Sequence, residues 1–76
     1  MNNSRRKKIT ESITSLKEAK SKLKQAHNEE KLALEKIPDD DEYDDMRWGM
    51  DEIISGLEDT LSSLEDALNS LENIDL

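Results

Sequence analysis

Hydrophobic residues along the chain follow two long helical patterns, one on each side of Pro38. In residues 1–37 the aliphatic positions recur at alternating steps of three and four, as on one face of an α-helix. These positions are Ile9, Ile13, Leu16, Leu23, Leu34 and Ile37. Proline disfavours a helical conformation of the residue before it. We therefore predict helices over about 4–36 and 44–74, joined by an acidic turn over 38–43, with Asp44 or else Asp39 as the N-cap of the second helix.

The short connection predicts that the two helices are antiparallel neighbours. We label heptad positions a to g, with Ile13 and Met50 each at position a. Small residues then recur at position g of both helices. They are Ala19, Ala26 and Ala33 in the first helix and Gly49, Gly56, Ser63 and Ser70 in the second. Because g faces g in an antiparallel pair, we expect these residues to meet between the helices and to let the backbones approach closely.

The apolar stripe of the second helix is broader than a hairpin can cover, because positions a, d and e are mostly apolar. A chain of 76 residues has little stability to spare. We therefore predict self-association, most simply as a dimer that forms an antiparallel four-helix bundle, or as a larger oligomer. The predicted fold class is all-α, with one helical-hairpin domain over residues 1–76.

Composition supports this fold class and excludes several functions. The chain has no Val and no Cys, which argues against a sheet, disulfides and thiolate chemistry. No apolar run resembles a signal peptide or a membrane span, so we expect a cytoplasmic protein that does not contact membranes. Residues 1–37 carry a net charge of +5 and residues 38–76 one of −13, so the helices attract each other. The total of −8 disfavours general nucleic-acid binding.

Polar residues interrupt the apolar face of the first helix at Lys20, His27 and Glu30. They form either a polar layer that fixes register and oligomeric state or a site. His27 and Glu30 reverse the Glu-x-x-His order of di-metal bundles, and the facing residues of the second helix are expected to be apolar, so we predict no metal and no cofactor. His27 is also the one candidate general base near neutral pH. Because no nucleophile or phosphate-binding loop accompanies it, we predict no enzyme activity.

Trp48 and Leu32 lie at position f, opposite the packed face, with Tyr43 and Arg47 near Trp48 in sequence. This group forms a further subunit contact, a solitary exposed apolar pair, or a recognition patch. In a recognition patch, Trp48 or Tyr43 would stack on a planar ligand and Arg47 would pair with an anion.

Charged rows suggest two other kinds of surface. Acidic pairs recur at positions b and c of the second helix: Asp44-Asp45, Asp51-Glu52, Glu58-Asp59 and Glu65-Asp66. They form either a solvated face or an imitation of a phosphate backbone. The basic residues of the first helix, among them Arg5, Arg6, Lys17 and Lys24, would instead hold phosphates unless the second helix neutralises them.

With this layout, the chain resembles small helical-hairpin proteins encoded by bacteriophages and mobile elements. The segments that carry the resemblance are Asn3-x-Arg5-Arg6-Lys7, Glu29-Glu30, Ile37-Pro38-Asp39, Tyr43-Asp44 and Met50-Asp51-Glu52-x-Ile54. The resemblance implies an accessory protein that acts in the cytoplasm of a bacterial host. It also implies that such a protein counters host defence without catalysis, by sequestering a nucleotide immune signal or by blocking a defence protein.

Three hypotheses follow, in this order. In the first, an oligomer binds and sequesters a nucleotide-type immune signal. Its ligand-binding residues would be Arg5, Arg6, His27, Tyr43, Arg47 and Trp48. In the second, the acidic face of the second helix binds a host defence protein, as an inhibitor or nucleic-acid mimic. In the third, the bundle is a structural or RNA-binding regulator that uses the first helix as its contact surface.

Overall fold

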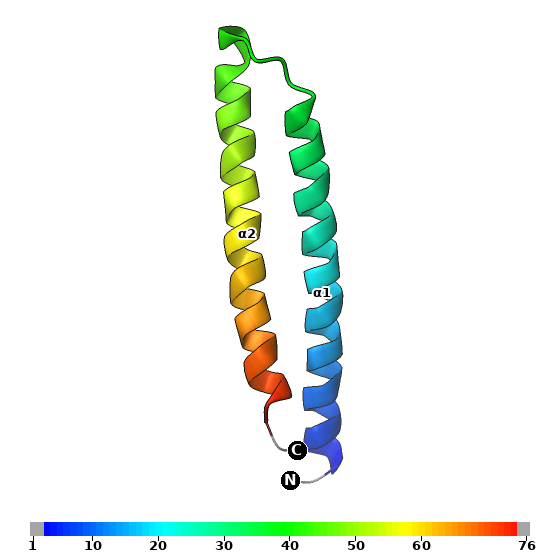
Figure 1. The fold of residues 1–76 in the computed structure, drawn as a ribbon. Helices are drawn as coiled ribbons and strands as arrows, with labels where there is room; N and C mark the ends of the chain where they lie inside the picture. The colour runs from blue at the N-terminus through cyan, green and yellow to red at the C-terminus, as the bar shows by residue number, and fades with distance from the viewer. Residues whose placement is uncertain (1–2, 75–76) are drawn as a thin grey trace.

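The computed structural model describes residues 3–74 as two antiparallel helices (Figure 1). Helix α1 spans Asn3–Glu35, a short 3₁₀ turn η1 spans Asp41–Tyr43, and helix α2 spans Asp44–Glu72. The residues described here contain no strand, so the prediction of an all-α hairpin is confirmed. The molecule is a rod of 60 × 15 × 13 Å. Helix α1 begins and α2 ends at one end of the rod, and the turn lies at the other.

The turn begins where the approach to Pro38 ends α1. The N–H groups of Lys36 and Ile37 still donate to carbonyl oxygens three residues earlier, each at 3.1 Å, and the chain then leaves the helix. The prediction that Asp44 or Asp39 caps α2 is wrong, because Tyr43 occupies the N-cap position and makes no side-chain capping bond. The cap belongs to η1 instead, where the carboxylate of Asp40 accepts from the backbone N–H of Glu42 at 3.3 Å.

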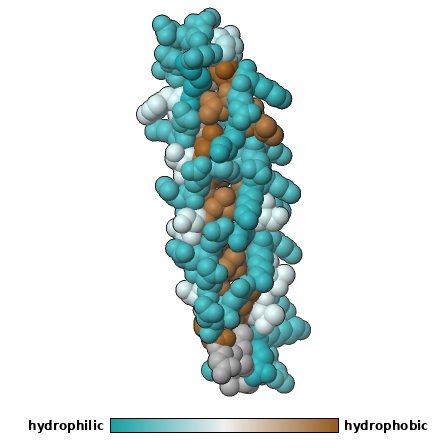
Figure 2. Space-filling model, in the orientation of Figure 1, coloured by the Kyte–Doolittle hydropathy of each residue, from teal (hydrophilic) through white to brown (hydrophobic). Residues whose placement is uncertain are grey.

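The helices pack through different heptad positions. Helix α1 turns its a and d positions inward, whereas α2 turns its a and e positions inward. Within residues 3–74 the buried side chains are Ile54 and Leu68, both at e of α2, which are 8% and 5% exposed. Figure 2 shows the resulting seam as a hydrophobic band that follows the long axis between hydrophilic side chains. The core is therefore one narrow line of aliphatic contacts.

The predicted contact between the small g residues does not form. Ala19, Ala26 and Gly56 are exposed. A Cβ atom added at Gly49 or Gly56 would meet no atom within 4 Å apart from the neighbouring residues and the helix's own backbone. The reason is the rotation of α2 about its axis. Position e carries the large aliphatic residues Ile54, Leu61 and Leu68, whereas d carries Ile53, Thr60 and Ala67, so turning e inward buries more apolar surface.

Neither helix, over the residues described, combines the length and the apolar composition needed to cross a membrane.

Candidate binding surfaces

A row of ion pairs joins the two helices along one side of the seam, which we call the ion-pair flank. The carboxylates come from position b of α2, one heptad apart, and the cations from positions a and e of α1. The pairs are Lys17–Glu72 at 2.8 Å, Lys20–Glu65 at 3.5 Å and His27–Glu58 at 2.8 Å. Members of the acidic pairs at b therefore contact α1, so those pairs do not form a uniformly solvated face.

The ion-pair flank explains two of the three polar interruptions in the apolar face of α1. His27 is 15% exposed and its Nε2 shares a hydrogen bond with the carboxylate of Glu58. The expectation that α2 presents only apolar residues to His27 is wrong, because the turn of α2 toward position e brings position b within reach. Lys20 and Glu65 repeat the arrangement one heptad away. This favours a polar layer that fixes the register of the hairpin, and the described residues contain no group of three His, Cys, Asp or Glu that would hold a metal ion.

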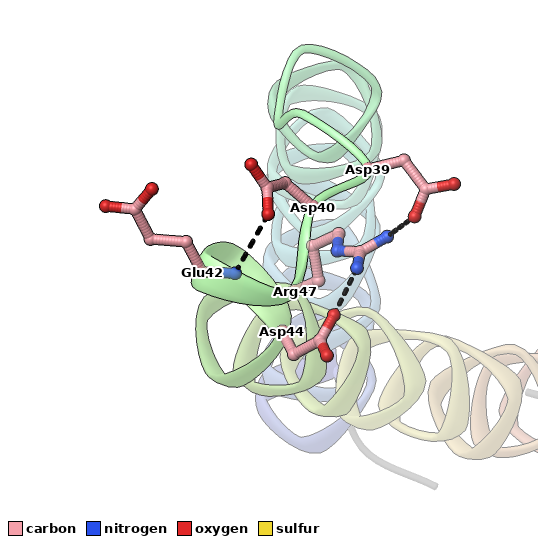
Figure 3. A network of polar contacts seen from close by, with 5 residues as sticks. All are labelled: Asp39, Asp40, Glu42, Asp44 and Arg47. Atoms are coloured by element: carbon pink, nitrogen blue, oxygen red, sulfur yellow. Dashed lines mark hydrogen bonds and ion pairs between the residues drawn. The ribbon is translucent and has the colours of Figure 1, made fainter.

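Arg47 fastens the turn to α2. Its guanidinium donates to the carboxylates of Asp39, before η1, and Asp44, in the first turn of α2 (Figure 3). These two hydrogen bonds raise the pKa of Arg47, so its charge is fixed. The side chain is 27% exposed, and its Nε is shielded from solvent with no hydrogen-bond partner in the described structure. Two carboxylates thus already compensate the cation that the sequence suggested for pairing with an anion.

Trp48 is at position f of α2, which adjoins position b around the helix. Its side chain is 66% exposed. It lies between two shallow hollows. The first hollow also contains Leu34 of α1, Ile37 just after the end of α1, Arg47, and three carboxylates from Asp44, Asp45 and Asp51. The second adds Glu52 and Asp59 to Asp51. We call Trp48 with Asp45, Asp51, Glu52 and Asp59 the Trp48 surface.

The remaining predicted site residues do not join the Trp48 surface. Tyr43 is half-buried and, like Leu32, lines neither hollow, although Leu32 is 57% exposed. Arg5 and Arg6 are exposed in the first turns of α1, at the opposite end of the rod. About thirty helical residues separate them from the turn, which is roughly 45 Å at 1.5 Å per residue. One chain therefore brings Trp48 and Arg47 together but leaves Arg5, Arg6 and His27 apart from them.

The Trp48 surface has the chemistry of a site for cations. An indole ring attracts Lys or Arg side chains through its π face, and neighbouring carboxylates add ion pairs. No protein-family model, curated protein or solved structure matches the chain.

Proposed function

We propose that the protein is a non-enzymatic binding protein whose Trp48 surface docks a basic segment of a partner protein. The observation that carries this proposal is the 66% exposure of Trp48 among carboxylates of α2. Tryptophan is enriched among the residues that dominate protein interfaces, because it buries a large area on binding. The partner would place an Arg or Lys side chain over the indole and further basic residues beside Asp51, Glu52 and Asp59.

A protein that binds nucleic acid through basic residues offers such a segment. The position c carboxylates Asp45, Glu52, Asp59 and Asp66 recur every seven residues, so they stand about 10 Å apart along α2. This row would engage successive cations of one basic surface. Inhibition of a host protein in this way is the second hypothesis from the sequence. The resemblance to phage proteins adds a bacterial cytoplasm as the location and a host defence protein as the partner.

The other two hypotheses have less support. A nucleotide at Trp48 would meet the carboxylates of both hollows, and the nearest guanidinium, Arg47, already pairs with Asp39 and Asp44. For RNA binding by α1, the ammonium groups of Lys17 and Lys20 already lie beside glutamates of α2. In both hypotheses, cations that would bind phosphate already pair with carboxylates of the same chain.

Self-association is the second part of the proposal. Only two side chains in the described part of the chain are buried, which is a small core for a domain of this length. Further burial between copies of the hairpin would supply the missing stability. The Trp48 surface lies on the outer side of α2. An oligomer that packs through the side of the hairpin opposite the ion-pair flank leaves Trp48 accessible.

Trp48 is the only tryptophan and reports on its own surface. The test is a titration with an octa-arginine peptide, followed by the Trp48 fluorescence, beside a calorimetric titration with cyclic dinucleotides. We expect a saturable fluorescence change with the peptide and no heat of binding with the nucleotides. Binding of a nucleotide without binding of the peptide would instead support sequestration of a nucleotide signal.

A further inference from the structure

The flank of the hairpin that lies away from the ion pairs is apolar. Lys17 at position e of α1 meets Glu72 at position b of α2, so rows e and b share one flank. The helical period then places row g of α1 and row d of α2 together on the opposite flank. We call these residues the apolar flank: Ala19, Ala26 and Ala33 of α1 with Met46, Ile53, Thr60 and Ala67 of α2.

Exposed side chains run along this flank at heptad spacing. Met46 is 53% exposed and Ile53 is 52% exposed. The hydroxyl of Thr60 donates to the carbonyl oxygen of Gly56 at 2.8 Å, so that polar group is satisfied within the helix and the methyl group remains for contacts. A continuous row of this kind is typical of a helix that packs against further helices.

We propose that the apolar flank binds a second copy of this chain in the reversed direction, which gives an antiparallel four-helix bundle. This inference rests on the self-association in the proposed function, and it adds the face and the direction of packing. The hairpin that the sequence predicts would then be one half of a symmetric unit.

The exposed area of the hairpin fits one further interface. The chain exposes 5913 Å². A compact protein of the same mass exposes about 4,700 Å², so the hairpin carries about 1,200 Å² more than a compact monomer. A stable dimer buries about 800 Å² from each partner. One hairpin-sized neighbour would cover an area of that order.

The glycines beside row d favour close approach of another helix. Glycine is unfavourable within a helix, and the hairpin itself gives no steric reason for Gly49 or Gly56, since a Cβ atom at either would meet open space. Position g of α2 adjoins position d on the same side. A partner helix that packs on Ile53 therefore passes close to both glycines, where the missing Cβ atoms let the backbones approach.

The charges at the two ends of the rod favour a second copy that packs in the reversed direction. One end of the rod carries Arg5, Arg6, Lys7 and Lys8 on exposed positions, and the other carries Asp39, Asp40, Asp41 and Glu42. A copy in the same direction would place like charges side by side at both ends. A reversed copy places each basic end beside an acidic turn, and the contact is self-complementary about a twofold axis.

The face is tested by measuring the mass of the full chain with light scattering after size exclusion. We expect twice 8.7 kDa for the natural sequence. Ile53→Lys should raise the dimer dissociation constant at least about tenfold, the effect of 1.4 kcal/mol at an interface, while the circular dichroism stays helical. Leu32→Lys is the matched control, because Leu32 is similarly exposed at 57% but lies on the outer side of α1, and this variant should remain a dimer.

Two results would overturn this face: a dimer that survives Ile53→Lys, or a dimer that Leu32→Lys disrupts and Ile53→Lys does not. If Ile53→Lys loses its helicity, Ile53→Ala takes its place and should weaken the dimer in the same direction. A monomeric natural protein would contradict self-association altogether. Binding of octa-arginine at Trp48 is a separate readout, and it is repeated on the Ile53→Lys variant because Gly56, beside the apolar flank, also lines the second hollow next to Trp48.

The direction is tested by cross-linking, since the chain has no cysteine. In a reversed dimer Met46 lies near Ala67 of the partner and far from the partner's Met46. A short bis-maleimide should therefore link a mixture of Met46→Cys and Ala67→Cys chains into a mixed dimer and leave Met46→Cys alone unlinked. Efficient linking of Met46→Cys to itself would show packing in the same direction and overturn the proposal.

Discussion

His27 and Glu58 meet across the hairpin at 2.8 Å, and Lys20 and Glu65 meet at 3.5 Å one heptad away. The same difference of seven residues on both helices means that one register satisfies both pairs. A slide of one helix along the other would break both pairs at once. These contacts therefore determine how the ends of α1 and α2 align at the turn, and so the position of Trp48 along α1.

Replacement of His27 by leucine should stabilise the hairpin. His27 is 15% exposed within the seam, whereas Glu58 is 54% exposed and would remain hydrated without its partner. A leucine at this a position adds apolar burial, so we expect the free energy of unfolding to rise by about 1 kcal/mol. Urea denaturation at fixed protein concentration measures this. Asn28→Leu, on an exposed position, is the control and should change stability little. A lower free energy of unfolding for His27→Leu would contradict the prediction and show that His27 stabilises the fold beyond setting the register.

Lys20 and Glu65 should show a small favourable coupling. Both side chains are partly exposed, at 30% and 46%. A double-mutant cycle with Lys20→Ala and Glu65→Ala should therefore give a coupling energy of about 0.2–1 kcal/mol, which falls as salt is raised. Denaturation at low and high salt measures it. The same cycle with Lys22 in place of Lys20 should give none, and a coupling that ignores salt would argue against an ion pair.

Arg47→Met should loosen the turn without unfolding the hairpin. The substitution removes the hydrogen bonds to Asp39 and Asp44 but leaves the seam intact. We expect faster amide hydrogen exchange in residues 40–47 and unchanged exchange around Leu68. Arg6→Met, far from the turn, is the matched control. Uniformly faster exchange along both helices would mean that Arg47 supports the whole fold.

Gly56→Ala should affect the hairpin and the dimer in opposite directions. Apart from the neighbouring residues and the helix's own backbone, no atom lies within 4 Å of the added Cβ, so the helix gains about 1 kcal/mol from propensity. The same methyl group would obstruct a partner that packs on row d. We expect greater stability at protein concentrations where the chain is monomeric and a higher dimer dissociation constant. Gains in both quantities would place the partner on another face.

The sequence predicted the two helices and the acidic turn well, because heptad spacing and Pro38 act locally. It failed on the rotation of α2. Positions d and e are both apolar in the first heptad, at Ile53 and Ile54. In the next two heptads Leu61 and Leu68 at e are larger and more apolar than Thr60 and Ala67 at d, and this difference turns position e toward α1. The error carried over to the small g residues and to the environment of His27. The sequence contained a signal that was missed. Lys20 and His27 are seven residues apart on α1, and Glu58 and Glu65 are seven residues apart on α2, so one register pairs both cations with both carboxylates.

The candidate Trp48 surface was predicted only in part. The exposed position of Trp48 follows from its heptad position f and agrees with the structure. The engagement of Arg47 depends on how the chain folds back at Asp39, eight residues earlier, which no helical period specifies. The separation of Arg5 and Arg6 from the turn follows from helix length once the hairpin is known.

The central claim is that the Trp48 surface binds basic protein segments, and the fluorescence titration tests it most directly when two charge-matched variants are compared. Asp51→Asn with Glu52→Gln removes two carboxylates beside Trp48, whereas Glu11→Gln with Glu18→Gln removes two on exposed positions of α1, far from Trp48 and outside the position c row. We predict that the first variant binds octa-arginine about fivefold more weakly than the second, since each exposed charge contact contributes about 0.2–1 kcal/mol. Equal binding by the two variants would show only a nonspecific response to net charge and would contradict the claim.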